Sequence, residues 1–235
     1  MLYLIGGLGA LLSVLLIVVA IAVFLLWPPP SGVSAWFALF QQNGFRGLLD
    51  LDLVMMVTYV VMVPLYLALF VALRRASQSI MAIALAFNLI AAVLILAANP
   101  GVAMLTLSGQ YAAAKTTAEQ AMYLAAGQSL LANWSGSAFV VGYLLGGIGI
   151  LITSAVMLRS KIFSKLIAYM GFVMGALMLI PASAGTVGLW ISLLSLAPTA
   201  VWLALVGMTL MRLASGMLAE SGESYVIGHP RRRRA

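Results

Sequence analysis

The chain has 235 residues, of which 64% are hydrophobic and 7% are charged, and its net charge is +7. A soluble domain carries about 25% charged residues, so this composition excludes an ordinary globular protein and leaves the lipid bilayer as the medium. Cysteine is absent, which excludes disulfides and thiolate metal sites. The single histidine, His229, lies in the C-terminal tail, which argues against haem and histidine metal centres. We therefore expect no metal, no cofactor and no nucleic-acid partner.

Six apolar runs follow one another along the chain, and most approach the ~20 residues that cross ~30 Å of hydrocarbon. They predict an all-α, polytopic membrane protein whose domain, residues 1–212, is a bundle of six transmembrane helices. The first run is longer than the core of a signal peptide and ends in three prolines, so we interpret it as a retained span. The predicted spans are residues 4–26, 51–73, 80–98, 138–158, 163–180 and 187–211.

The basic residues lie almost entirely in alternate gaps between these runs. Only Arg46 and Lys115 lie in the other gaps. Because cytoplasmic loops carry an excess of lysine and arginine, we expect both termini in the cytoplasm. The tail, residues 213–235, is expected to be flexible, and its arginines either attract anionic lipid or only reinforce the orientation. The basic residues on the cytoplasmic side are Arg74, Arg75, Arg159, Lys161, Lys165, Arg212 and Arg231 to Arg234.

Two segments on the predicted outer face are longer than plain connectors. Residues 28–47 contain Ser34 followed by aromatic residues, which predicts a serine-capped short helix at the membrane interface. Residues 99–137 contain Thr116 and Glu119 at the spacing of a capping box. This segment predicts one or two surface helices that cover the bundle, either as a structural cover or as a lid.

Polar side chains near the start of span two form a candidate cluster at the outer interface. Arg46 precedes Asp50 by four residues, so the two side chains can pair across one helical turn. Asp52 adds a second carboxylate, but its depth is near the membrane boundary, where a charge costs less than at the centre. We interpret Arg46, Asp50 and Asp52 as a pair at a helix start, with a functional carboxylate as the alternative.

Polar side chains also recur at helical spacing within three predicted spans, as expected of faces turned toward protein. Span six shows the pattern best, because its small and hydroxyl residues alternate at steps of four and three. For span six we favour helix packing around a kink at Pro198, and the alternative is that these faces line an uncharged polar cavity. The candidate lining residues are Tyr59, Tyr66, Asn88, Ser192, Ser195, Thr199 and Trp202.

Glycines three or four residues apart on spans four and five predict close helix contacts. Gly142, Gly146 and Gly149 lie on span four, and Gly171 and Gly175 lie on span five. A short basic turn joins the two spans, so we expect these glycines to pack within one chain. The pattern is compatible with an oligomer but does not require one.

No arrangement typical of catalysis is present in the sequence. No histidine accompanies the serines of the spans, so none has an evident base to activate it as a nucleophile. Asp50 and Asp52 are two residues apart and point in different directions on one helix, so they cannot form a carboxylate pair. We predict no catalytic residues and disfavour an enzyme.

Several segments resemble a family of bacterial six-span membrane proteins known as a domain of unknown function. They are residues 44–52, the run to Leu73-Arg74-Arg75, residues 143–160, residues 165–171 and residues 205–207. The family often has a proline after the arginine-serine turn, where this chain has Ser164. The resemblance implies the six-span fold and the bacterial cytoplasmic membrane, and it implies no substrate.

Three functions compete on this basis. The uncharged polar faces favour binding or transport of a small neutral or lipid-like molecule. The glycine faces and the lack of catalytic chemistry favour a regulatory or assembly partner that transports nothing. A lipid-modifying enzyme ranks third. Membrane lipids are the partners expected in each case.

Overall fold

The computed structural model describes residues 1–51 and 53–227, and side chains as far as residue 216. This part of the chain is all-helical, as expected, and contains no β-strand. Its ten helices are α1 (Leu2–Leu26), α2 (Val33–Gln42), α3 (Gly44–Asp50), α4 (Leu53–Leu73), α5 (Gln78–Ala98), α6 (Gly101–Ala113), α7 (Thr117–Trp134), α8 (Ser137–Arg159), α9 (Lys165–Leu177) and α10 (Gly185–Ile227).

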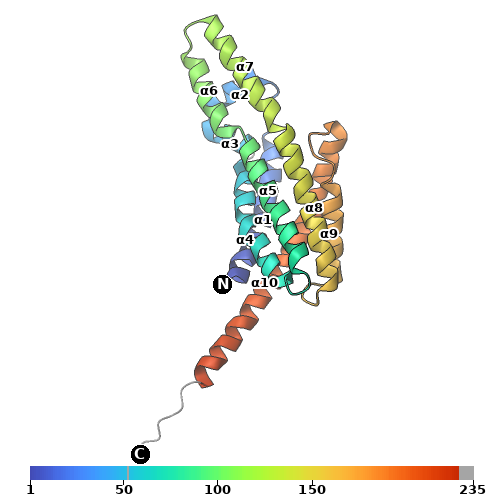
Figure 1. The fold of residues 1–235 in the computed structure, drawn as a ribbon. Coiled ribbons are helices and arrows are strands. Elements are labelled where there is room, and N and C mark those ends of the chain that lie inside the picture. The colour runs from blue at the N-terminus through green and yellow to red at the C-terminus, as the bar shows by residue number, and fades with distance from the viewer. Residues whose placement is uncertain (52, 228–235) are drawn as a thin grey trace, which may run out of the picture.

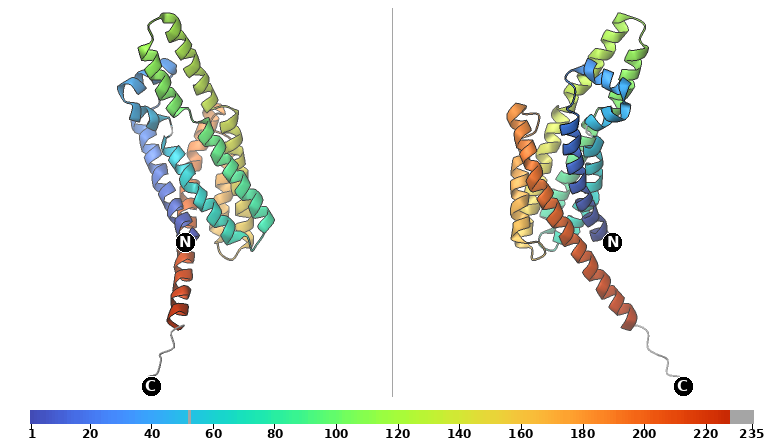
Figure 2. Two further views of the ribbon diagram at one scale, coloured as in Figure 1. Left: turned by 60° about the vertical axis from the view of Figure 1, so that its left-hand side comes forward. Right: turned by 180° about the vertical axis from the view of Figure 1, so that it is seen from behind.

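Helices α1, α4, α5, α8, α9 and α10 pack as a closed ring, in which each contacts the next along the chain and α10 returns to α1. Successive members run in alternate directions, so the N-terminus and the exit of α10 from the bundle lie at the same end (Figures 1 and 2). That end also holds the turn between α8 and α9 and is called the basic end, after Arg159, Lys161 and Lys165. The opposite end, which carries α2, α3, α6 and α7, is called the cap end.

Five helical stretches of the described chain are long and apolar enough to cross a membrane. Helix α9 is shorter, because its 13 residues extend over only about 20 Å. Within the predicted span 163–180, the helix itself covers Lys165–Leu177: Ser164 is the N-cap, and the chain leaves the helix before Pro181. The five stretches are Leu2–Leu26, Leu53–Leu73, Gln78–Ala113, Thr117–Arg159 and Gly185–Gly216.

The glycine faces of α8 bring two neighbouring helices close. A Cβ atom added at Gly142 would lie 3.1 Å from the carbonyl oxygen of Ala91 on α5, and one added at Gly149 would lie 2.7 Å from Asn88 Nδ2. The expected α8–α9 contact instead uses Gly147, where an added Cβ would lie 3.0 Å from the Gly175 carbonyl oxygen. The predicted span-four glycines thus pack mainly on α5.

Helix α1 makes equally close contacts that the sequence interpretation missed. Added Cβ atoms at Gly6 and Gly9 would lie 2.9 Å and 2.8 Å from carbonyl oxygens of α4, those of Pro64 and Val61. One added at Gly7 would lie 3.0 Å from the Gly207 carbonyl oxygen on α10. Three small residues within one helical turn therefore let α1 close the ring on both sides.

A second hydrophobic core, separate from that of the ring, lies at the cap end. Helix α2 starts after Gly32, whose φ of +84° suits glycine, so Ser34 is not the predicted cap. The rings of Trp36 and Phe37 are buried against α6 and α7; the Phe37 and Tyr111 rings have centroids 5.3 Å apart. Segment 99–137 forms two helices, α6 and α7, as predicted, but they make a hairpin that projects beyond the ring and does not cover it (Figure 1).

The start of α7 and the C-terminal part of α10 can be compared with the sequence predictions. The capping box at the start of α7 is present: Glu119 N donates to Thr116 Oγ1, and the Glu119 carboxylate accepts from Thr116 N. Beyond residue 213, α10 continues as a helix to Ile227, where the sequence predicted a flexible tail. His229 and the four terminal arginines lie outside the described residues.

Candidate functional site

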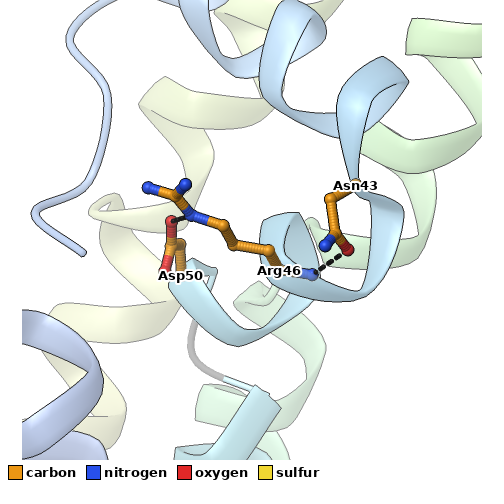
Figure 3. Close-up of polar contacts among 3 residues, drawn as sticks. All are labelled: Asn43, Arg46 and Asp50. Atoms are coloured by element: carbon orange, nitrogen blue, oxygen red, sulfur yellow. Dashed lines mark hydrogen bonds and ion pairs between the residues drawn. The ribbon is translucent and has the colours of Figure 1, made fainter. Parts of the chain in front are cut away.

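The strongest candidate site begins with the short helix α3 at the cap end. Asn43 caps this helix, because its Oδ1 accepts a hydrogen bond of 3.0 Å from the backbone N–H of Arg46 (Figure 3). Gly47 lies so close to the ring of Phe40 that an added Cβ would approach it to 2.6 Å. The cap and this contact fix α3 against α2.

Asn99 holds the other end of α3, at the junction with α4. Its Nδ2 donates to the Leu51 carbonyl oxygen at 2.6 Å, and its Oδ1 accepts from Gly101 N at 2.9 Å. Leu51 is fully buried. One amide side chain thus joins the chain preceding α4 to the start of α6, which leaves α3 little freedom to move.

Arg46 and Asp50 form the ion pair that their spacing predicts. Arg46 Nε lies 3.7 Å from Asp50 Oδ2, which is too long for a hydrogen bond. In Figure 3 the two terminal nitrogens of the guanidinium point away from the carboxylate. Asp52, the third member of the predicted cluster, lies outside the described residues.

The Asp50 side chain is completely buried, and neither of its oxygens has a hydrogen-bond partner in the described part of the chain. Burial raises the pKa of this carboxyl above its ordinary value of 3.8, and the nearby Arg46 guanidinium lowers it by less. Desolvation therefore outweighs the attraction of the ion pair. A buried carboxylate left without hydrogen bonds is energetically costly, which marks this position as a functional candidate.

Trp27, at the end of α1, completes the cluster. Arg46 Cζ lies 5.5 Å from the centroid of its ring, within the range of a cation–π interaction. A small pocket of about 40 Å³ opens beside Asp50 between α1, α3 and α4. Besides Asp50, whose carboxylate is buried behind the pocket surface, the lining residues are apolar: Ala20, Val23, Phe24, Trp27, Pro29, Leu49, Val54 and Met55.

This arrangement suits an amine ligand. An ionised carboxylate can accept about four hydrogen bonds, and the two Asp50 oxygens accept none within the described chain. Both oxygens are buried behind the pocket surface, so an ammonium group reaches them only when the pocket wall moves, and it would then supply donors without displacing an existing hydrogen bond. The aromatic and aliphatic walls would exclude water from this contact and so strengthen it.

The sequence interpretation did not identify Trp27 as a site residue. The sequence feature that could have identified Trp27 is its position at the end of an apolar run, directly before three prolines that turn the chain. Which side chain of α3 it meets depends on the return of the chain through α2, and spacing along the sequence does not reveal that.

The predicted cavity-lining residues lie on α4, α5 and α10. Tyr66, Asn88, Ser195 and Trp202 are buried, whereas Tyr59, Ser192 and Thr199 are partly exposed. Tyr66 and Trp202 belong to one packed apolar core.

Most of the polar groups in this set bond locally. The hydroxyls of Ser195 and Thr199 donate to carbonyl oxygens of their own helix, at 2.7 Å in both cases. Asn88 Nδ2 likewise donates to the Ala84 carbonyl oxygen at 2.8 Å. The hydroxyl of Ser192 instead bonds to that of Tyr143 on α8, at 2.9 Å, a partner that the sequence did not suggest.

Comparison with known proteins gives one match. The family model described as Domain of unknown function (DUF4386) matches residues 1–213. No curated protein and no solved structure matches the chain.

Proposed function

The chain belongs to the DUF4386 family, and we propose that it is a six-crossing membrane protein that binds the amine-bearing head group of a lipid-like molecule. The binding site is the pocket that Trp27 and Asp50 line, with Arg46 in contact with both of these residues. The membrane is the bacterial cytoplasmic membrane, which residues 1–212 cross and residues 213–235 leave on the cytoplasmic side. The long apolar helices indicate a helical membrane protein.

The six-crossing topology is supported by the ring and by the distribution of charge. Helix α9 lies in the ring between α8 and α10, so it fills the place of a fifth crossing despite its length. The basic residues in the α4–α5 and α8–α9 turns lie at the end that also carries the N-terminus. The excess of positive charge makes this end cytoplasmic.

Cysteine labelling tests the topology, because the native chain contains no cysteine. Lys115→Cys, in the exposed loop between α6 and α7, should react with a membrane-impermeant maleimide added outside intact cells. Arg75→Cys and Ser160→Cys, at the basic end, should react only after the membrane is opened. Labelling of Arg75→Cys in intact cells would contradict the orientation.

The buried carboxylate of Asp50 carries the functional proposal. It lines a pocket at the end of α1, where the helix has already risen about 35 Å from Leu2 and reaches the hydrocarbon boundary. The head group of a lipid in the adjacent leaflet lies at this depth. An ammonium group there gains an ionic contact with Asp50, while the attached chains remain in hydrocarbon.

The same pair favours a zwitterionic head group. Arg46 and Asp50 are themselves one positive and one negative charge, and the terminal guanidinium nitrogens of Arg46 point away from Asp50 (Figure 3). A phosphate can bind those nitrogens while the ammonium binds the carboxylate. The head group as a whole is neutral, in agreement with the neutral or lipid-like ligand that the sequence favours.

The volume of the pocket favours a primary amine. One water molecule needs about 10–15 Å³ of cavity volume, measured as the space open to the centre of a water-sized sphere. The pocket has about 40 Å³ of this volume, so it accommodates a few waters, or an ammonium group with its adjoining methylene. A trimethylammonium group is too large. We therefore expect a phosphoethanolamine head group to bind more tightly than a phosphocholine head group with identical chains.

Asp50→Asn tests the site by removing the charge and leaving the shape. Hydrogen bonds to charged groups contribute about 1.5–3 kcal/mol, so the affinity for phosphatidylethanolamine should fall about tenfold or more. Native mass spectrometry of the purified chain with lipids of defined head group measures this loss. Affinity for phosphatidylcholine should change little.

The pH dependence of stability gives an independent readout of the same variant. Because the pKa of Asp50 is raised in the folded protein, ionisation of this group lowers stability above the raised pKa, and the loss is recovered as the pH falls toward 3.8. Asp50→Asn should therefore melt at a higher temperature than the native chain at pH 7, and the difference should shrink near pH 4.

Glu119→Gln is the matched control, because Glu119 is an exposed carboxylate in the cap and lies outside the pocket. It should leave lipid affinity unchanged. Hydrogen bonds from the backbone of Lys115 and Thr116 lower the pKa of Glu119, so its contribution to stability is lost, not gained, as the pH falls. Equal loss of affinity in both variants would contradict a site at Asp50.

Contacts within the chain support binding more than transport, and they give no specific support to the alternative of a partner protein. The hydroxyls of Ser195 and Thr199 already bond to their own helix, which leaves them less available to line a transport path. Gly147 and Gly175, like the glycines that face α5, are occupied by contacts within the chain. They therefore give no specific support to a partner subunit.

A further inference from the structure

A groove lies at the basic end of the ring, between the start of α9 and the part of α10 that leaves the bundle. It has a volume of about 420 Å³, roughly ten times that of the pocket at Asp50. Five of its lining residues are apolar: Ile162, Ile167, Leu205, Met208 and Leu213. A groove of this size and composition accommodates a stretch of hydrocarbon chain.

The polar rim of this groove is made of Ser164, Thr209 and Arg212. The hydroxyl of Thr209 is used internally, since it donates to the Leu205 carbonyl oxygen at 2.8 Å. Arg212 is exposed and has no ion-pair partner among the residues that the structure describes. Its guanidinium therefore has free donors at the mouth of an apolar groove.

Ser164 places the start of α9 at the same rim. It is the N-cap of this 13-residue helix, so the first backbone N–H groups and the positive end of the helix dipole lie there. Lys161 and Lys165 flank the rim and are exposed. Glu119 and Asp50, the acidic residues whose side chains the structure describes, both lie at the cap end.

The groove thus combines an apolar channel with a mouth that carries only positive charge within the described residues. We propose that it binds one phospholipid with an anionic head group, whose phosphate contacts Arg212 and the N-terminus of α9 and whose acyl chain fills the groove. This is a second lipid site at the opposite end of the bundle, and it does not depend on the amine pocket at Asp50.

The charge of the mouth decides between classes of lipid. A zwitterionic head group would place its ammonium among Lys161, Lys165 and Arg212, where like charges repel it. A head group that carries only the phosphate charge meets attraction alone. The two sites therefore prefer different lipids, zwitterionic at the cap end and anionic at the basic end.

Native mass spectrometry of the full chain with lipids of identical acyl chains tests the proposal. The native protein should retain phosphatidylglycerol more tightly than phosphatidylcholine. Arg212→Ala should reduce the retention of phosphatidylglycerol about tenfold, as expected for loss of a charge-assisted hydrogen bond, and Arg212→Lys should restore part of it. Inorganic phosphate, offered as a separate probe, should bind weakly because it lacks the chain that fills the groove.

Arg75→Ala is the matched control, because Arg75 is an exposed arginine at the same end that does not line the groove. It should change retention less than twofold. Met208→Trp should fill the groove and reduce phosphatidylglycerol binding while leaving Arg212 in place. Equal losses in Arg212→Ala and Arg75→Ala, or unchanged retention in Arg212→Ala, would overturn the proposal. Tight binding of inorganic phosphate alone would identify a free-anion site instead.

Discussion

Gly6→Val is expected to destabilise the protein severely. A single Cβ at this position would lie 2.5 Å from the Cβ of Ala68, 2.9 Å from the Pro64 carbonyl oxygen and 3.3 Å from Leu65 Cα. Two of these three atoms are backbone, so no side-chain rotation relieves the overlap. Helices α1 and α4 would have to separate along their contact, and the ring would open at that point.

Overpacking of this kind costs about 1–3 kcal/mol, and we expect a value at the upper limit because valine adds two further methyl groups. Thermal unfolding in detergent, followed by circular dichroism, measures the loss. Gly109→Val is the matched control, since nothing lies within 4 Å of an added Cβ there. A second change, Ala68→Gly, removes the nearest obstructing atom and should recover part of the loss. An unchanged melting temperature in Gly6→Val would refute the close α1–α4 contact.

Gly171→Ala is expected to disturb the junction of α8, α9 and α10. The added methyl group would collide with the hydroxyl oxygen of Ser154 and would lie 2.8 Å from Trp202 Nε1. The serine hydroxyl already donates to the Ile150 carbonyl oxygen at 2.8 Å, and the tryptophan is completely buried. Neither side chain has free space nearby.

We expect a loss of about 1–3 kcal/mol, together with a change in the fluorescence of the buried Trp202. Ser154→Ala removes the hydroxyl oxygen, so the double variant with Gly171→Ala should recover part of the stability. In contrast, Gly109→Ala lies on an open helix face and should stabilise by up to about 1 kcal/mol. If Gly171→Ala behaved like Gly109→Ala, the junction would be looser than the structure indicates.

Part of this fold was predictable from the sequence alone. Hydropathy alone located the long helices, because a bilayer requires apolar segments of nearly fixed length. The capping box of Thr116 and Glu119 and the pair of Arg46 and Asp50 were predictable too, since both are local and depend only on spacing along one helix. Contacts between residues three or four apart form whenever the helix that carries them forms, whatever its place in the bundle.

Contacts between distant segments were not predictable to the same degree. The faces of Gly142 and Gly149 pack on α5 and not chiefly on α9, because α8 has both helices as neighbours in the ring and the spacing of its glycines does not say which neighbour each face meets. The rings of Trp36 and Phe37 point into the cap for the same reason. The pocket at Asp50 needed Trp27, which a long chain reversal brings to it.

The short helix α9 has a consequence for the lipid beside it. In the proposed six-crossing topology, α9 offers about 20 Å of helix against about 30 Å of hydrocarbon. A shortfall of this size is met by hydrophobic mismatch, in which the bilayer thins where it touches the protein. The leaflets next to α9 should therefore dip toward each other, and the protein should favour membranes whose acyl chains are short.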